Sequence, residues 1–314
     1  MITPTTTPTT TPHSGEPSIM PYVRPELRRR ARLIPHPPVQ YRTARWVTSN
    51  GQLLFPTPRR EGVDVLRRGH YLIFRPHKPK GALLWLHGGG HIIGHPSQDG
   101  PMCANTAAEV GVTVVAPRYP LSPAHPFPTG LNFALEAWAW MHAHADEFGA
   151  PFAIGGESAG GGLAAAACQQ LLDEGGPLPR AQWLFCPMLD DRPTADRCRD
   201  LPRDRPVANN AQTRFAWASY LGQSPGAVVV PQYSVPARRD DLRGLPPAWL
   251  SAGDIELFYP EICEYALRLR DAGVPAQLEI IEGAPHAVEL WAFDIGVVKQ
   301  MLASARRWLG DQLN

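Results

Sequence analysis

The stretch Phe152-Ala153-Ile154-Gly155-Gly156-Glu157-Ser158-Ala159-Gly160, followed by the alanine-rich run Leu163 to Ala167, decides the fold of this 314-residue chain. The apolar start predicts a short buried strand, and the alanine-rich run predicts a helix directly after it. Between them the sequence matches the pattern G-x-S-x-G, in which glycines permit a sharp turn and the serine hydroxyl projects above a sheet. The helix N-terminus beneath the serine favours developing negative charge. The stretch therefore predicts a nucleophilic Ser158 at the carboxyl end of a strand.

Short apolar runs and amphipathic stretches alternate along the chain from about residue 46. The runs that indicate strands are 71–74, 83–86, 112–115, 152–154, 183–186, 249–251 and 278–281. The stretches with helical spacing of apolar residues are 131–138, 163–172, 262–269 and 297–309. Strand, helix and strand in repetition predict an α/β fold with a mostly parallel, doubly wound sheet covered on both faces.

Proline-rich segments surround this predicted catalytic unit. The chain contains 35 prolines, roughly double the average usage of about 5%. Residues 1–20 contain TPTTTPTTTP, which has almost nothing to bury and predicts a disordered tail. We expect residues 21–45 to form an N-terminal cap segment. Residues 190–232 form an inserted cap segment over the carboxyl ends of the strands, where ligands bind in open α/β sheets. Residues 46–189 and 233–314 then make up the catalytic domain.

Composition excludes several classes of partner. The 30 Lys+Arg and 29 Asp+Glu leave a net charge of +1, so no nucleic-acid partner is expected. No stretch approaches the roughly 18 apolar residues of a membrane span, and no signal-peptide pattern is present, so stable membrane insertion is not expected. The 5 cysteines are widely spaced and lack a C-x-x-C pair, which fits reduced thiols better than a disulfide frame or a zinc site. We therefore expect a cytoplasmic protein.

A second glycine run, His87-Gly88-Gly89-Gly90, follows the strand that is predicted to end at Leu86. Attack of a serine on an acyl carbonyl creates an oxyanion, and glycines let bare backbone N–H groups approach it. A phosphate-binding loop would instead end in Lys followed by Ser or Thr, which this run lacks. The run predicts an oxyanion hole formed by the N–H groups of Gly88 and Gly89, together with that of Ala159 after the serine.

The two glycine motifs together resemble the hormone-sensitive-lipase family of α/β-hydrolases, the bacterial family IV esterases. Arg118-Tyr119 followed by Pro123-Ala124-His125-Pro126-Phe127-Pro128 resembles the segment after the second parallel strand of that family. The resemblance runs from about residue 70 to the C-terminus and weakens over the insertion, which corresponds to the family's variable cap. It implies an α/β-hydrolase fold with a helical cap. Glu157 stands where most members carry Asp or Thr, and because the carboxylate is retained we expect it to keep a supporting role.

A catalytic serine needs a base, and in this fold the chain order is Ser, then Asp or Glu, then His. Of the 11 histidines, His286 is the one in the expected place. It ends the loop Glu282-Gly283-Ala284-Pro285-His286, after the strand that is predicted to end at Ile281. The family usually shows His-Gly-Phe here, whereas this chain has His286-Ala287-Val288. We predict that His286 is the base.

Two carboxylates, Asp254 and Glu256, are candidates for the acid that orients this base. Glu261 and Tyr265-Ala266 resemble the Asp-Glu and Tyr-Ala of family members. When these residues are aligned, the position of the family's catalytic acid falls on Glu256. The separation 286 − 256 = 30 residues also agrees with the resemblance. We favour Glu256 and keep Asp254 as the alternative.

These residues predict a serine carboxylesterase, a carboxylic ester hydrolase that cleaves short- to medium-chain acyl esters through an acyl-enzyme intermediate on Ser158. The same machinery also serves amides, lactones and acetylated substrates, which remain alternatives. A non-catalytic small-molecule receptor, such as the gibberellin receptors that resemble this family, is disfavoured because those receptors lack the histidine base. The chemistry needs no metal or cofactor, and no ligand cluster with metal-site spacing is visible. The expected partners are a small ester substrate and, because many relatives dimerise through an edge strand, a second copy of the chain.

Overall fold

A single mixed sheet forms the centre of the molecule. The computed structural model describes residues 18–35, 37–51, 58–197 and 206–314. Within them the strand order is β1-β2-β4-β3-β5-β6-β7-β8. The strands are β1 (Val63–Arg68), β2 (Tyr71–Pro76), β3 (Ala82–Leu86), β4 (Thr113–Pro117), β5 (Phe152–Glu157), β6 (Gln182–Phe185), β7 (Ala248–Gly253) and β8 (Ala276–Ile281). β2 pairs antiparallel with both β1 and β4, and the strands from β4 to β8 pair in parallel. The predicted α/β fold class is confirmed.

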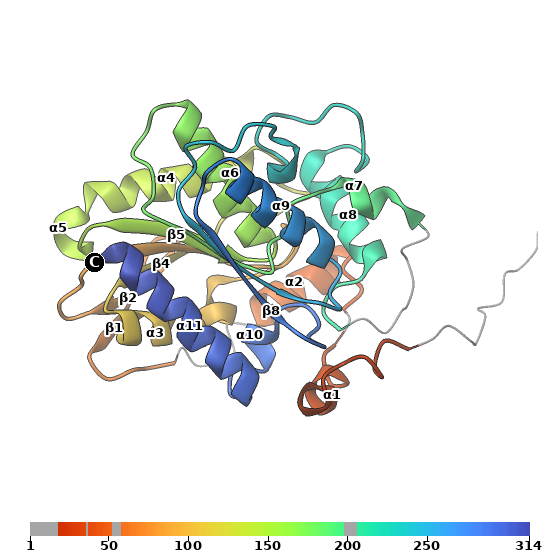
Figure 1. The fold of residues 1–314 in the computed structure, drawn as a ribbon, viewed down its shortest axis with the longest axis horizontal. Coiled ribbons are helices and arrows are strands. Elements are labelled where there is room, and N and C mark those ends of the chain that lie inside the picture. Colours follow the sequence, from red (N-terminus) through yellow and green to blue (C-terminus); the bar gives the residue numbers. More distant parts are fainter. Residues whose placement is uncertain (1–17, 36, 52–57, 198–205) are drawn as a thin grey trace, which may run out of the picture.

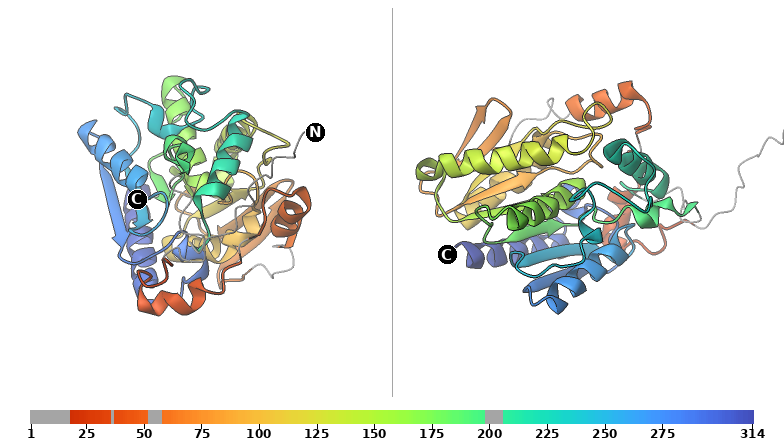
Figure 2. Two further views of the ribbon diagram at one scale, coloured as in Figure 1. Left: turned by 90° about the vertical axis from the view of Figure 1, so that its right-hand side faces the viewer. Right: turned by 90° about the horizontal axis from the view of Figure 1, so that it is seen from above.

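Helices cover both faces of the sheet, as Figures 1 and 2 show. One face carries α4 (Thr129–Ala143), α6 (Ala159–Asp173) and α9 (Tyr259–Asp271), and the other carries α3 (Gly100–Val110) and α11 (Gly296–Leu313). The alternation along β3 explains this, because Leu84 and Leu86 pack in the first core and Leu83 and Trp85 pack in the second. Burial of both faces is what turns these strands into continuous apolar runs.

Some elements lie outside the sequence prediction. β1 was not predicted, because this edge strand has the sequence VDVLRR and lies half exposed. α3 was not predicted either, since it opens with Gly100-Pro101 and ends at the left-handed Gly111, whose φ is 78°. The insertion contains α8 (Asn210–Leu221), preceded by the short α7 (Arg192–Ala195). The remaining short helices along the sheet are α5 (Ala145–Phe148) and α10 (Val288–Trp291).

The N-terminal segment packs against the catalytic unit through two helices. α1 (Pro25–Ala31) buries Leu27 completely, in the same core as Ile281 and Ala284. α2 (Arg42–Gly51) runs across the expected boundary between residues 45 and 46. The Gln212 side chain of α8 donates to the Pro37 carbonyl at 3.1 Å and so links this segment to the insertion. Residues 1–17 of the predicted tail and residues 198–205 of the insertion lie outside the described residues.

The helices bear on the prediction that no segment of the chain spans a membrane. Among the described residues, no helix is both long and apolar enough to cross a membrane.

Candidate active site

Ser158 occupies the sharp turn between β5 and α6. Its backbone has φ 54° and ψ −120°, a conformation that is costly for a residue with a side chain. The surrounding glycines make the turn possible, because a Cβ on Gly160 would lie 2.0 Å from the Leu86 carbonyl oxygen. The Ser158 N–H donates to the Phe185 carbonyl at 2.9 Å, and the Met188 N–H donates to the Ser158 carbonyl at 2.9 Å. The turn is therefore held by neighbouring backbone while its side chain stays free to react.

His286 lies in the loop between β8 and α10 and faces the serine. Its Nε2 is 2.9 Å from Ser158 Oγ, and its Nδ1 is 2.5 Å from Glu256 Oε2. The three side chains are buried. Trp291 Nε1 donates to the His286 carbonyl at 3.1 Å, and the Phe258 ring meets the imidazole edge-on at 5.0 Å between centroids. With a carboxylate accepting at Nδ1, the ring carries its proton there and offers the Nε2 lone pair to the serine.

The two candidate acids have different partners in the structure. Glu256 faces the imidazole with one oxygen and accepts from the Gly253 N–H at 3.2 Å with the other. Asp254 turns away and accepts from the Gly283 N–H at 2.6 Å. Glu256 is therefore the carboxylate that contacts His286, and Asp254 ties down the loop on which His286 lies.

The predicted oxyanion-hole residues lie beside the serine. β3 and β5 are parallel neighbours, so the loop after Leu86 meets the turn that holds Ser158. Gly89 has φ 118°, and a Cβ on it would lie 2.1 Å from the Ile93 carbonyl oxygen, so the loop needs glycine there. Gly88 packs against Glu157, and Ala159 is the first residue of α6, where N–H groups have no intrahelical partner. The glycine loop and the first turn of α6 therefore meet next to Ser158.

A pocket with a cavity volume of about 120 Å³ opens over Ser158 and His286. Its lining comes from both segments that were expected to form a cap as well as from the catalytic unit. The lining residues are Val39, Gly89, Gly90, Ile92, Ile93, Glu157, Ser158, Met188, Val207, Ala208, Gln212, Thr213, Ala216, Phe258 and His286. Most of these side chains are apolar, so the reacting serine faces a largely apolar chamber.

Three further carboxyl groups, Asp99, Glu157 and Glu289, lie buried near the site, and we call them the acid cluster. Trp85 Nε1 donates to Asp99 Oδ2 at 2.7 Å. Burial, with repulsion from Glu289, raises the pKa of Asp99 to about 7, and burial, with repulsion from Glu256, raises the pKa of Glu289 to about 7. The same causes raise the pKa of Glu157 well above its usual range. The cluster therefore holds protons that exposed carboxyl groups would have lost.

Sequence reasoning did not single out Cys186, which also borders the site. Its Sγ lies 4.0 Å from His286 Nε2 and donates to Glu289 Oε1 at 3.3 Å. One donor atom from each of Glu157, Cys186 and His286 lies within 4.8 Å of the others. These residues are 29 and 100 positions apart in the chain, so no spacing motif reveals them. The available signal was that each follows or ends a predicted strand.

Comparison with known proteins places this site in a family. The family described as having the alpha/beta hydrolase fold matches residues 83–290. Carboxylic ester hydrolase LipN of Mycobacterium tuberculosis is 32% identical over 225 residues, which cover 68% of this chain and 59% of LipN. Ethyl acetate hydrolase of Pseudomonas putida is 31% identical over 235 residues, which cover 70% of this chain and 72% of that enzyme.

Solved structures agree with these relatives. A bacterial heroin esterase superposes with a TM-score of 0.84 at 31% identity, covering 95% of this chain and 100% of that chain. An esterase from the bacterial hormone-sensitive lipase family superposes with a TM-score of 0.78 at 28% identity, covering 93% of this chain and 99% of that chain.

The fold and the site define an α/β-hydrolase. More narrowly, the chain belongs to the hormone-sensitive-lipase family of carboxylic ester hydrolases, the family IV esterases. The predicted family and class of enzyme are thereby confirmed.

Proposed function

We propose that the chain is a serine carboxylesterase that hydrolyses short- to medium-chain acyl esters, with Ser158, His286 and Glu256 as its catalytic triad. The observation that carries this proposal is one continuous hydrogen-bonded line. It runs from Glu256 Oε2 to His286 Nδ1 at 2.5 Å and from His286 Nε2 to Ser158 Oγ at 2.9 Å. Nucleophile, base and orienting acid thus have the mutual contacts that covalent catalysis by serine requires.

The mechanism follows from these contacts. His286 Nε2 accepts the hydroxyl proton as Ser158 Oγ forms a bond to the ester carbonyl carbon. Glu256 stabilises the resulting imidazolium, while the N–H groups of Gly88, Gly89 and Ala159 hold the oxyanion. The imidazolium then protonates the departing alcohol, which leaves an acyl group on Ser158. Water loses a proton to His286, attacks the acyl carbon and releases the carboxylic acid.

The pocket supports a small or medium acyl ester as substrate. Its cavity volume of about 120 Å³ lies below the roughly 300–1,000 Å³ of sites for drug-sized ligands, which favours a small substrate. Mostly apolar walls favour an alkyl chain, and a polar reaction centre at the base fits the ester group. Rates for p-nitrophenyl esters from acetate to palmitate test the chain length, and an optimum at palmitate would contradict it.

Replacement of the serine tests the proposed chemistry directly. We expect Ser158→Ala to lower the turnover of p-nitrophenyl butyrate by about 10⁵- to 10⁶-fold, as loss of a nucleophile does in comparable enzymes. The variant should also lose covalent labelling by a fluorophosphonate. Ser219→Ala, in α8, is the matched control and should keep both properties. Hydrolysis by Ser158→Ala at the parental rate would refute the proposal.

Two chain segments act as a cap in this proposal. The division into residues 21–45 and 190–232 as cap segments is supported by the pocket, because Val39 lies in the first and Val207 to Ala216 contribute from the second. A cap of this kind limits the space available to the acyl and alcohol groups.

The cellular location and assembly also remain proposals. A cytoplasmic location is supported by Cys103, Cys168, Cys186 and Cys263, which are free thiols, while Cys198 lies outside the described residues. A homodimer through β8 is supported by the position of that strand at the edge of the sheet and by Ile280, whose side chain is exposed. Sedimentation of Ile280→Lys against the parent tests the dimer.

A further inference from the structure

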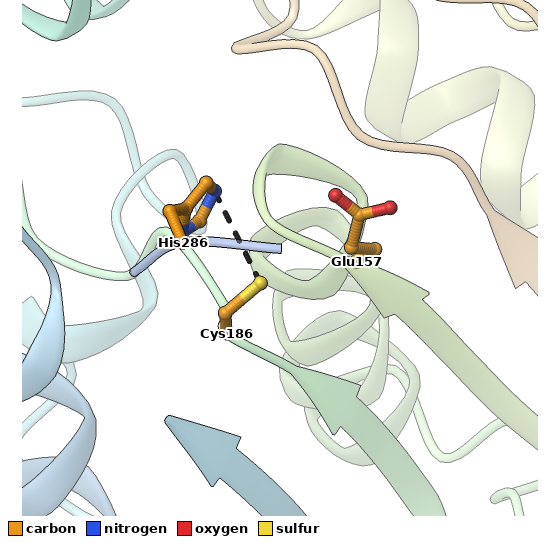
Figure 3. Close-up of side chains that lie close together, drawn as sticks. All are labelled: Glu157, Cys186 and His286. Carbon is orange, nitrogen blue, oxygen red and sulfur yellow. Dashed lines mark hydrogen bonds between the residues drawn. The ribbon is translucent and has the colours of Figure 1, made fainter. Parts of the chain in front are cut away.

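Three side chains with metal-binding chemistry converge beside the nucleophile. Glu157 is the last residue of β5, Cys186 directly follows β6, and His286 lies in the loop after β8. Figure 3 shows the Cys186 thiol close to the His286 ring, with the Glu157 carboxylate across from them. Carboxylate, thiolate and imidazole are together the ligand types of zinc sites in proteins.

The distances between these donors suit a tetrahedral ion. Cys186 Sγ and His286 Nε2 are 4.0 Å apart, and one Glu157 oxygen lies within 4.8 Å of both. In a tetrahedral zinc site with ordinary bond lengths, sulfur and nitrogen ligands lie about 3.5 Å apart. A contraction of a few tenths of an ångström would bring the imidazole and the thiol to that spacing. Ser158 Oγ, 2.9 Å from the same Nε2, is placed to supply a fourth ligand.

The Glu157 carboxylate provides a second, independent sign of a ligand. Its Oε2 is buried and has no hydrogen-bond partner among the described residues. A buried carboxylate oxygen without a partner is costly, and coordination to a cation removes that cost. A cation held between this oxygen, the Cys186 sulfur and the His286 ring would give the Glu157 carboxylate the partner that it lacks.

We propose that Glu157, Cys186 and His286 form an inhibitory site for a thiophilic divalent cation, with Zn²⁺ as the best fit. Binding displaces the thiol proton of Cys186 and the carboxyl proton of Glu157 to solvent, so that thiolate and carboxylate coordinate the ion. The Nε2 lone pair of His286 coordinates the ion and is no longer available to the Ser158 proton. Hard cations such as Mg²⁺, which prefer all-oxygen ligands, do not bind there.

Binding of the ion stands independently of the esterase mechanism, whereas inhibition by the ion rests on the proposed function of His286 as the base. Burial raises the pKa of the Cys186 thiol well above its usual range, so the metal-free thiol carries its proton and donates to Glu289. Because binding releases that proton, affinity for the cation should rise with pH.

Direct binding is measured with Co²⁺, which replaces Zn²⁺ and gives a thiolate-to-cobalt charge-transfer band. We expect one equivalent of Co²⁺ to produce this band in the parent and in Ser158→Ala, and Zn²⁺ to remove it. Cys186→Ala should lack the band, and Cys186→Ser serves as a second variant if the first does not fold. Cys168→Ala, which removes a buried thiol from α6, and Cys263→Ser are matched controls and should keep it.

Inhibition is measured with p-nitrophenyl butyrate across a series of Zn²⁺ concentrations. Zn²⁺ should abolish parental turnover, a chelator should restore it, and Mg²⁺ should have no effect. Relative to its own turnover without metal, Cys186→Ala should need at least about tenfold more Zn²⁺ for half-inhibition, as loss of metal-site interactions does elsewhere.

Other results distinguish the two proposals. Absence of the band in the parent, or equal bands in Cys186→Ala and Cys168→Ala, would overturn the metal site. Equal Zn²⁺ sensitivity of those two variants would do the same. A band in a parent protein that hydrolyses no ester would retain the metal site and refute the esterase function instead.

Discussion

Two groups of buried polar side chains meet near the His286 ring, and they differ in how their polar atoms are satisfied. On one side, Glu256 and Ser158 each have a partner on the imidazole. On the other side lies the acid cluster, in which Glu157 Oε2 has no partner among the described residues. The side chains of both groups are buried, so the groups differ in their hydrogen-bond partners and not in their exposure.

The difference teaches how partners bear on a buried carboxyl group. Both oxygens of Glu256 have a partner, one in the His286 ring and the other in the Gly253 N–H. A carboxyl group that faces other carboxyl groups in a dry interior takes up a proton instead, as the raised pKa values of Asp99 and Glu289 indicate. The first arrangement can orient a base, and the second stores protons beside it.

Removing His286, which links Glu256 to Ser158, should have the largest effect. We expect His286→Ala to lower turnover by about 10⁵- to 10⁶-fold, because it removes the proposed base. The double variant with Ser158→Ala should be no slower than either single variant, since residues that act as one unit have non-additive effects. Steady-state kinetics with p-nitrophenyl butyrate measures this. If the fold-loss of turnover in the double variant equalled the product of the two single losses, the two side chains would not act together.

A smaller effect should separate the two acids that follow β7. We expect Glu256→Gln to lower turnover by about 10³- to 10⁴-fold, because the amide can still hold the imidazole but cannot stabilise its charged form. Asp254→Asn is the matched comparison and should cost less than about tenfold, since Asp254 contacts the Gly283 N–H and not the ring. Turnover numbers for both variants measure the difference. A larger loss in Asp254→Asn would exchange the two assignments.

Much of the fold was predictable because the central strands are buried on both faces and read as apolar runs. β1 escaped prediction because an edge strand with the sequence VDVLRR lacks that signal. Helix α3 escaped it because glycine and proline at its start weaken the helical pattern. Sequence patterns thus identified the central strands, because burial on both faces makes their sequences uniformly apolar.

The residues of the candidate site were predictable where they lie in turns or loops directly after strands. Ser158 and His286 could be located because sharp turns and chain order restrict where they occur. The choice of Glu256 over Asp254 needed a family resemblance, because the turn after β7 decides which carboxylate reaches the ring. Glu157 was singled out by the resemblance, whereas Cys186, Asp99 and Glu289 were not found, since they approach it only through the tertiary fold.

The protons bound by the acid cluster should make the free energy of unfolding depend on pH. With the Asp99 pKa raised to about 7 in the folded state, against about 3.9 when unfolded, the folded protein binds a proton that the unfolded chain has lost. The free energy of unfolding should therefore fall as the pH rises from about 4 to about 7. Asp99→Asn keeps an acceptor for Trp85 Nε1 and removes this titration. The variant should gain stability over the parent in that interval, by a few kcal/mol at most.

Chemical denaturation at pH 5 and pH 8 measures this gain, because it gives the free energy of unfolding at each pH. Asp311→Asn, which changes an exposed carboxyl group near the C-terminus, is the control and should follow the parent at both values. Glu289, whose pKa is also raised to about 7, still titrates in Asp99→Asn, so the decline should become shallower without disappearing. An unchanged decline in Asp99→Asn would mean that Asp99 is ionised in the folded protein. The contrast between a paired and an unpaired set of buried acids would then not hold.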